Sequence, residues 1–217
     1  MKIAIIGTGD VGRQIAQRLV GLGHEVTVGS RAADSEEVRA WAAGVGAGYT
    51  TFAEAAAAGE LVVNAIGGLN SVAALTAAGE PNLRGKVLID ISNPIDFSAG
   101  FPPRIPLAAG GVSIAEEIQG TFPDTHVVKS LNTVANTVMV DPGRVPGGHQ
   151  IFVAGNDRAA KDTVAGLLGE FGWPADRILD LGDLTAARAL EQYLGVWLQF
   201  SKALGTYDLN IEIHRAG

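Results

Sequence analysis

The sequence contains no cysteine, and charged residues make up only 18% of its 217 residues. The absence of cysteine excludes a disulfide framework, a cysteine nucleophile and thiolate-bound zinc or iron–sulfur centres. The four histidines are scattered with no pair at metal-ligand spacing, so we predict no metal site. No apolar run approaches the roughly 18 residues of a membrane span. Acidic residues outnumber basic ones 23 to 16, and the resulting net charge of −7 argues against a nucleic-acid or membrane partner.

Hydrophobic residues make up 47% of the chain, which at this length predicts a folded protein with a self-sufficient core. The chain opens directly on a strand-like apolar run at residues 3–6. This opening leaves no room for a signal peptide, and we expect a soluble, cytoplasmic protein.

Short β-branched runs alternate with alanine-rich amphipathic stretches, a pattern typical of repeated βα units around a parallel sheet. The predicted strands are residues 3–6, 25–28, 49–50, 61–66, 86–91, 127–131, 150–153 and 178–181, with a terminal strand over 207–213. The predicted helices are residues 10–22, 35–44, 52–58, 70–78, 113–122, 158–171 and 184–204. A long loop is expected over residues 92–112. The predicted fold class is α/β, with a Rossmann-type, doubly wound, mostly parallel sheet and a small C-terminal helix–strand extension.

Gly7, Gly9 and Gly12 form a G-x-G-x-x-G motif directly between the first predicted strand and helix. Gly7 allows the tight turn, Gly9 lets backbone approach a pyrophosphate, and Gly12 lets the helix pack on the strand. The start of the helix offers unpaired N–H groups and the positive end of its dipole to phosphates. A purely structural glycine turn is the alternative, but this context favours dinucleotide binding.

The second predicted strand ends in Gly29, Ser30 and Arg31, with no acidic residue at the last two positions. A protein that reads NAD usually has Asp or Glu there, which accepts bonds from the ribose hydroxyls. A carboxylate would repel a 2′-phosphate, whereas arginine offers a fork of donors and serine a hydroxyl. A solvated arginine is the alternative interpretation, but the pattern predicts NADP(H) as the cofactor.

Ligands on such sheets bind beyond the carboxyl ends of the strands. Four further segments are expected at that edge: residues 64–68, 91–94, 129–133 and 155–156. Small residues at 65–68 would let a flat ring lie against the backbone. Asn93 and Asn132 could bond the nicotinamide amide or the ribose, or equally cap loops, and Pro94 would shape the turn.

Lys129 is the one chargeable side chain expected near these strand ends. As a general acid it could protonate a carbonyl oxygen during hydride delivery. Its place in an apolar strand also fits a structural ion pair, with Asp90 as the candidate partner. No Ser-His-Asp set or carboxylate pair is visible, so we predict no catalytic residue and a site that positions its reactants.

Several blocks in one order resemble the coenzyme F420-dependent NADP oxidoreductases. The matching blocks are residues 1–12, 22–31, 90–94, 127–133 and 180–184. This resemblance spans most of the chain. It implies a Rossmann domain with a small C-terminal extension, usually dimeric, and reversible hydride transfer between NADP(H) and a bound deazaflavin.

In that family the positions of Thr8 to Val11 hold the pyrophosphate, those of Ser30 and Arg31 hold the 2′-phosphate, and those of Ile66 and Asn93 lie by the nicotinamide. The predicted cofactor-binding residues are Gly7, Thr8, Gly9, Asp10, Val11, Gly12, Ser30, Arg31, Ala65, Ile66, Gly67, Asn93, Pro94 and Asn132. Family members often carry a basic residue just after the Ser-Arg pair, whereas residues 32–35 here have none. This departure leaves Arg31 as the principal cation. Residues 192–217 are unlike the archaeal enzymes and more like bacterial relatives.

We therefore expect an NADP-dependent oxidoreductase that passes a hydride between NADP(H) and a deazaflavin (coenzyme F420) or a flavin, directly from ring to ring. Such a transfer is mainly an orientation task for two stacked rings, which the small and apolar surfaces of Ala65, Ile66, Gly67 and Pro94 would suit. One alternative is an NADPH-dependent reductase of a small carbonyl or imine, with Lys129 and Asn132 assisting. Another is a non-catalytic NADP(H) sensor.

The two parts of the chain are expected to have different tasks. Residues 1–182 would form the NADP-binding Rossmann domain, and residues 183–217 would border the second-substrate pocket. The last helix carries the bulky aromatic residues Tyr193, Trp197 and Phe200. This aromatic surface predicts a homodimer contact, with a role in the core as the alternative.

Overall fold

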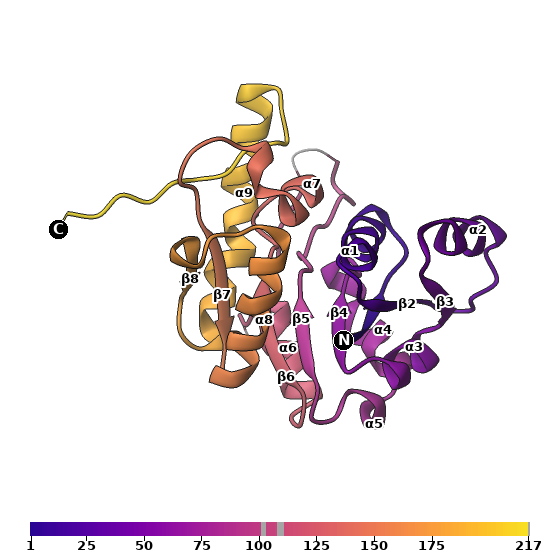
Figure 1. The fold of residues 1–217 in the computed structure, drawn as a ribbon. Coiled ribbons are helices and arrows are strands. Elements are labelled where there is room, and N and C mark those ends of the chain that lie inside the picture. The colour runs from indigo at the N-terminus through magenta and orange to yellow at the C-terminus, as the bar shows by residue number, and fades with distance from the viewer. Residues whose placement is uncertain (101–102, 108–110, 217) are drawn as a thin grey trace.

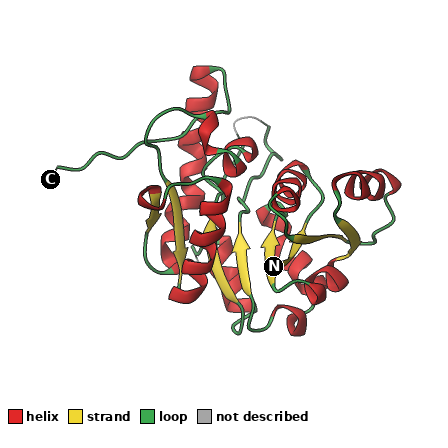
Figure 2. Ribbon diagram, in the orientation of Figure 1, coloured by secondary structure: helices red, strands yellow, loops and turns green. Residues whose placement is uncertain are grey.

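The computed structural model describes residues 1–100, 103–107 and 111–216. Within these ranges an eight-stranded sheet has the strand order β3-β2-β1-β4-β5-β6-β7-β8, and helices cover both of its faces (Figure 1; Figure 2). The strand order runs outward in both directions from β1 and β4, as in a Rossmann fold. The predicted α/β class with a mostly parallel, doubly wound sheet is confirmed.

Most boundaries of these elements follow the predicted ones closely, but two short helices, Glu80–Leu83 and Asn136–Val140, were not predicted. The strands are β1 (Lys2–Ile6), β2 (Glu25–Ser30), β3 (Gly48–Thr51), β4 (Leu61–Asn64), β5 (Val87–Asp90), β6 (His126–Ser130), β7 (Ile151–Gly155) and β8 (Ile178–Asp180). The helices are α1 (Asp10–Gly21), α2 (Glu36–Val45), α3 (Phe52–Ala58), α4 (Gly68–Ala78), α5 (Glu80–Leu83), α6 (Ile114–Thr121), α7 (Asn136–Val140), α8 (Arg158–Phe171) and α9 (Ala187–Leu204). Single 3₁₀ turns are η1 (Pro142–Arg144), η2 (Ala175–Arg177) and η3 (Leu184–Ala186).

Two apolar clusters lie on the two faces of the sheet. On one face Leu19 of α1 and Val164 of α8 pack against the strands. On the other face Phe52 of α3, Leu75 of α4 and Ile118 of α6 do the same. Because both faces are covered, the central parallel strands are continuous apolar runs in the sequence rather than alternating ones.

β7 runs antiparallel to β6, pairing Val128 with Gly155 and Ser130 with Val153. The carboxyl end of β7 therefore lies at the edge of the sheet opposite to the carboxyl end of β6. The prediction that residues 155–156 lie at the ligand-binding edge is wrong. A strand buried on both faces has the same apolar pattern in either direction, so the pattern carries no information on this reversal.

The predicted terminal strand over residues 207–213 is also wrong. One backbone bond links Gln150 N to Ile211 O at 3.1 Å. The side chain of Asn210 binds the neighbouring backbone groups that a strand would pair. Its Nδ2 donates to Gln150 O at 2.7 Å, and its Oδ1 accepts from Ile211 N at 2.8 Å. A side chain that binds these backbone groups competes with a strand ladder.

The predicted loop over residues 92–112 includes 101–102 and 108–110, which lie outside the described residues. In its described part, Asp96 and Arg104 form an isolated bridge. The predicted helix after the loop is α6, which begins with a capping box. Ser113 Oγ accepts from Glu116 N at 3.1 Å, and Glu116 Oε2 accepts from Ser113 N at 2.8 Å.

α9 lies along the sheet near β7 (Figure 1), where Leu190 packs against Phe152 and Ala154. Further along α9, Leu194 and Trp197 pack with Leu209. The division of the chain at residue 182 stays a prediction. Within the described ranges, no helix combines the length and the apolar character needed to cross a membrane.

Candidate active site

The glycine-rich loop joins β1 to α1, and Gly9 precedes α1 as its N-cap with no side chain capping that end. A Cβ on Gly12 would lie 2.3 Å from Gly7 O, so only glycine allows the helix to pack this closely on the loop. A Cβ on Gly9 would meet nothing within 4 Å. The first N–H groups of α1 therefore lie beside open space, an arrangement that fits a diphosphate.

The turn after β2 is held by the hydroxyl of Ser30. Its Oγ accepts from Ala33 N at 2.9 Å and lies 2.8 Å from Tyr49 Oη. Ala33 has φ +53°, in the left-handed region that a non-glycine residue adopts only when its surroundings hold it there. Arg31 is exposed, and its side chain has no hydrogen bond or ion pair to any residue in the described ranges. Ser30 and Arg31 stay predicted phosphate-binding residues.

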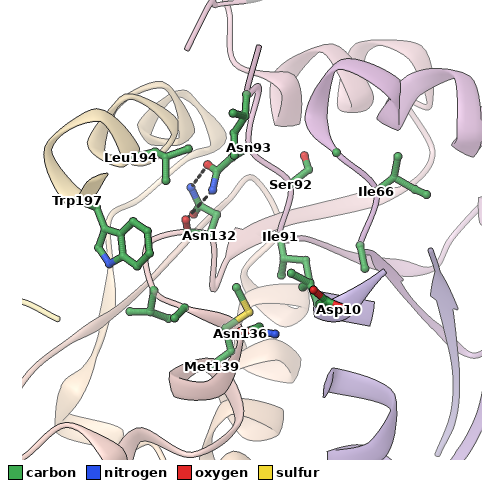
Figure 3. A pocket seen from close by; sticks show the side chains of 16 residues that line it. Asp10, Ile66, Ile91, Ser92, Asn93, Asn132, Asn136, Met139, Leu194 and Trp197 are labelled. Carbon is green, nitrogen blue, oxygen red and sulfur yellow. Dashed lines mark hydrogen bonds between the residues drawn. The ribbon is translucent and has the colours of Figure 1, made fainter. Parts of the chain in front are cut away.

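A cavity of about 370 Å³ opens where β4, β5 and β6 end, beside the start of α1 (Figure 3). The predicted residues that line it are Asp10, Val11, Ala65, Ile66, Gly67, Asn93 and Asn132. The predicted residues outside this lining are Gly7, Thr8, Gly9, Gly12, Ser30, Arg31 and Pro94. The structure thus brings the ends of β4, β5 and β6 together around one space.

Sequence reasoning missed much of the opposite wall. Ile91 and Ser92 also line the cavity, and they belong to the segment 91–94 that was expected at this edge. The lining residues that were not predicted are Ile95, Val134, Ala135, Asn136, Met139, Leu194 and Trp197. Two of them, Asn136 and Met139, belong to α7, a helix of 5 residues that is too short to produce a helical period in the sequence. Others come from α9, which closes the cavity on the side away from α1 (Figure 3).

Asn93 and Asn132 bind each other in this cavity. Asn93 Nδ2 donates to Asn132 O at 2.7 Å, and Asn132 Nδ2 donates to Asn93 Oδ1 at 3.0 Å. Asn132 Nδ2 also donates to Leu190 O on α9 at 3.0 Å. Asn132 Oδ1 and Ser92 Oγ are buried and have no hydrogen-bond partner in the described residues. A buried polar atom without a partner is costly, so these two oxygens are ready to bind a polar ligand.

The backbone just before Asn132 is strained. Leu131 has φ +64° although it carries a large, buried side chain. Such a conformation costs on the order of 1–3 kcal/mol and persists only where the surrounding structure imposes it. Here it turns the chain at the end of β6, so that Leu131 packs in the core while Asn132 reaches the cavity.

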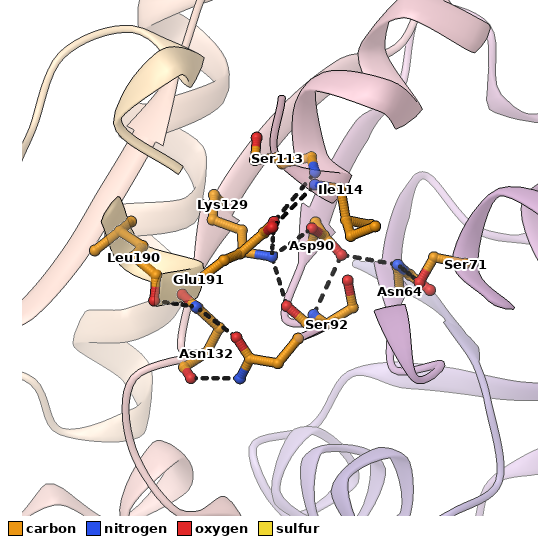
Figure 4. A network of polar contacts seen from close by, with 12 residues as sticks. Asn64, Ser71, Asp90, Ser92, Ser113, Ile114, Lys129, Asn132, Leu190 and Glu191 are labelled. Carbon is orange, nitrogen blue, oxygen red and sulfur yellow. Dashed lines mark hydrogen bonds and ion pairs between the residues drawn. The ribbon is translucent and has the colours of Figure 1, made fainter. Parts of the chain in front are cut away.

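Lys129 is absent from the residues that line the cavity and lies in a network of polar contacts with Asp90, Ser92 and Glu191 (Figure 4). Its Nζ lies 2.8 Å from Asp90 Oδ2 and 2.9 Å from Glu191 Oε1, and it donates to Ser92 O at 2.5 Å. All three charged side chains are fully buried. Burial opposes the charged form of Lys129, but the two carboxylates outweigh it and raise the pKa of the ammonium group. The ion pair with Asp90 is confirmed, and Lys129 is a charged structural residue in this geometry.

Glu191 is the partner that sequence reasoning missed. Its carboxylate also accepts from Ile114 N at 3.0 Å and Ala115 N at 3.3 Å, in the first turn of α6. Burial raises the pKa of Glu191, and Lys129 opposes this rise. The sequence could have indicated this partner, because Glu191 is an acidic residue on the apolar face of the last helix, beside Leu190 and Leu194. A buried acid in such a place requires a partner.

The aromatic residues of α9 divide between the core and the surface. Trp197 is 8% exposed and stacks on Tyr207 with ring centroids 5.8 Å apart. Phe200 is 41% exposed. Trp197 therefore belongs to the cavity wall, and Phe200 is the aromatic residue free to meet another surface.

The chain matches the family model described as NADP oxidoreductase, coenzyme F420-dependent, over residues 2–94. It is 31% identical to the F420-dependent NADP reductase of Methanothermobacter marburgensis, over 88% of each chain. Identity to the F420-dependent NADP reductase of Methanocaldococcus jannaschii is 29%, over 98% of this chain and all of the relative. The rat metalloreductase STEAP3 is 30% identical over 88% of this chain, which spans only 36% of that longer protein.

Among solved structures, an Arthrobacter sp. FB24 protein provisionally named an F420-dependent NADP reductase is 48% identical. It has a TM-score of 0.92 and covers 99% of this chain and 100% of its own. The imine reductase of Streptomyces aurantiacus, 20% identical with a TM-score of 0.67 over 94% of this chain and 64% of its own, shares the fold. Full-length similarity to the reductases, together with the glycine loop and the cavity beside it, shows that this chain is an NADP-dependent oxidoreductase of the F420-dependent NADP reductase family.

Proposed function

We propose that the protein transfers a hydride directly between the nicotinamide of NADP(H) and the ring of a deazaflavin (coenzyme F420) or a flavin. The observation that carries this proposal is the chemistry of the cavity lining. Asp10, at the start of α1, is the only titratable side chain among the described residues that line it. Reduction of a carbonyl or imine places the charge on the single atom next to the reacting carbon, which needs a proton donor beside it. A hydride added to a deazaflavin or flavin ring leaves a negative charge spread over that ring, which takes up its proton from solvent, so the protein's main task is to align the two rings.

Lys129 does not fill the role of that proton donor. Its ammonium group donates to two carboxylates and to Ser92 O, and its side chain is 0% exposed. Loss of a proton from Lys129 would leave the buried carboxylates of Asp90 and Glu191 without a positive partner, which is unfavourable at low dielectric. The geometry thus favours the ring acceptor over the carbonyl or imine alternative.

The residues present fit the two ring systems. Gly9 and the uncapped end of α1 would hold the diphosphate, with Ser30 and Arg31 at the 2′-phosphate. Asn132 Oδ1 and Ser92 Oγ, both without partners in the described residues, would bind the polar edge of a ring. When bound, NADPH supplies the hydride and the second ring accepts it. The part of the protein is to exclude water and to hold both rings face to face.

The test is an acceptor panel with the purified protein and NADPH, followed by the fall in nicotinamide absorbance. F420, FMN and FAD form one set of acceptors, and small aldehydes, ketones and cyclic imines form the other. We expect turnover with F420 or a flavin and none with the second set. Turnover with a carbonyl or imine alone would overturn the proposal, and binding of NADPH without turnover of any acceptor would favour a sensor.

A further inference from the structure

Arg39 of α2 reaches the turn where the 2′-phosphate is predicted to bind. α2 lies beside β3 at the edge of the sheet (Figure 1), and Tyr49 of β3 lies between Arg39 and Ser30. Arg39 Nη2 donates to Ala33 O at 2.7 Å. Its guanidinium carbon lies 5.5 Å from the centroid of the Tyr49 ring. The guanidinium plane is therefore held by one hydrogen bond and one aromatic face.

Tyr49 also fixes the orientation of the Ser30 hydroxyl through a hydrogen bond. A serine oxygen can accept two hydrogen bonds and donate one. Ser30 Oγ accepts from Ala33 N, and Tyr49 Oη at 2.8 Å is placed to donate to it. When Tyr49 is the donor, both acceptor positions of Ser30 Oγ are filled, and its proton is left for an anion.

Among the described residues, no carboxylate binds Arg39 strongly enough to prevent it from pairing with a phosphate. The nearest carboxylate is Glu36, whose Oε1 lies 3.7 Å from Arg39 Nε, too far for a hydrogen bond. Both of these side chains are at least half exposed, so the pair is weak. The next acid along α2, Glu37, is bound to Arg13 at 2.8 Å. Asp34, beside the turn, is exposed.

We propose that Arg39, oriented by Tyr49, is a second cation of the adenosine 2′-phosphate site and a determinant of specificity for NADPH over NADH. The inference rests on the proposed binding of NADP(H) at Ser30 and Arg31. It assigns to α2 the positive charge that residues 32–35 do not provide. A phosphate monoester carries close to two negative charges near neutral pH, which two guanidinium groups match.

The experiment measures Kd for NADPH and for NADH by calorimetry in the wild type and in Arg39→Gln. A charged hydrogen bond to the phosphate predicts about a tenfold weaker Kd for NADPH, with Kd for NADH unchanged. Arg39→Lys should retain part of the preference, because it keeps the charge and loses the planar fork. Tyr49→Phe should also weaken NADPH binding selectively, because it removes the group that orients Ser30.

Arg158→Gln is the matched control, since Arg158 is an exposed helical arginine with an acidic partner, Asp162, at 3.8 Å. It should change neither Kd. If Arg39→Gln leaves the ratio of the two Kd values unchanged while Arg31→Gln lowers the preference, the role of Arg39 is wrong and the coenzyme assignment stands. If the wild type does not prefer NADPH, the coenzyme assignment itself fails.

Discussion

Lys129 of β6 and Glu191 of α9 form an ion pair, with 2.9 Å between Nζ and Oε1, in a place where neither side chain reaches solvent. One turn of α9 also binds the cavity residue Asn132, through Leu190 O. α9 is thus joined to the sheet at Leu190 and Glu191, and its next turns supply Leu194 and Trp197 to the cavity wall. The buried charges therefore set the position of that wall relative to the strand ends.

Glu191→Ala should destabilise the protein by about 3 kcal/mol, because it leaves Lys129 with one carboxylate and removes the acceptor of two N–H groups of α6. Urea unfolding measures this loss. Lys202→Ala, at an exposed position of the same helix, should cost less than about 0.5 kcal/mol. Equal stability of the two variants would show that the buried pair does not hold α9.

Stability should fall at acidic pH through Glu116. Hydrogen bonds from Arg188 hold the pKa of the Glu116 carboxyl below its ordinary value of 4.5, against the opposing effect of burial. A lowered folded-state pKa contributes stability above 4.5 that is lost as the pH falls through the folded value. Urea unfolding from about pH 6 to about pH 3.5 should therefore show a smaller pH dependence in Glu116→Gln. The exposed Glu117→Gln should behave as the wild type, and an identical pH dependence in all three would contradict this role.

Asn132→Ala should lower kcat/KM for the ring acceptor by about tenfold or more, because Asn132 binds both Asn93 and Leu190 at the cavity. Asn82→Ala removes a comparable amide, which donates to Ala53 O and Ala78 O away from the cavity. The two variants should lose similar stability, and only the first should lose activity. Equal kcat/KM in the two variants would show that Asn132 has no role in the active site.

Arg31→Glu should weaken NADPH binding by about a hundredfold, because it replaces a donor to the phosphate with a repelling charge. NADH binding should change little. Kd values from calorimetry measure both effects, with Arg158→Glu as the exposed control. Unchanged NADPH affinity would show that the 2′-phosphate lies elsewhere.

The outer face of α9 predicts a homodimer. Val196, Phe200 and Leu204 follow one another at intervals of four residues, and they are 48%, 41% and 67% exposed. A row of exposed apolar side chains on one helix face favours contact with a second apolar surface. Light scattering at micromolar concentration should give the mass of a dimer, and Phe200→Asp should shift it toward the monomer. A monomeric wild type would end this prediction.

Local patterns predicted most of the fold. Alanine-rich amphipathic stretches between β-branched runs located α1, α3 and α8, and α6 begins within one residue of its predicted start, where Ser113 and Glu116 form the capping box. The glycine motif located the loop before α1. These features depend on neighbours within a few residues, so they can be recognised without knowing the fold.

Local patterns could not predict the direction of β7 or the residues of the far wall of the cavity. A buried strand has the same composition whichever way it runs. α7 is too short to show a period, and Asn210 disrupted an expected strand through contacts with Gln150. Each of these outcomes depends on a segment distant in the chain.

The sequence by itself determined the alternation of strands and helices, the phosphate loop and the absence of acid beside Ser30, because each is a matter of short-range spacing and residue chemistry. Only the tertiary structure decided that Lys129 pairs with Glu191 and that Arg39 meets Tyr49 behind Ser30. The physical reason is that the free energy of a buried charge or a stacked guanidinium depends on which distant groups surround it once the chain has folded.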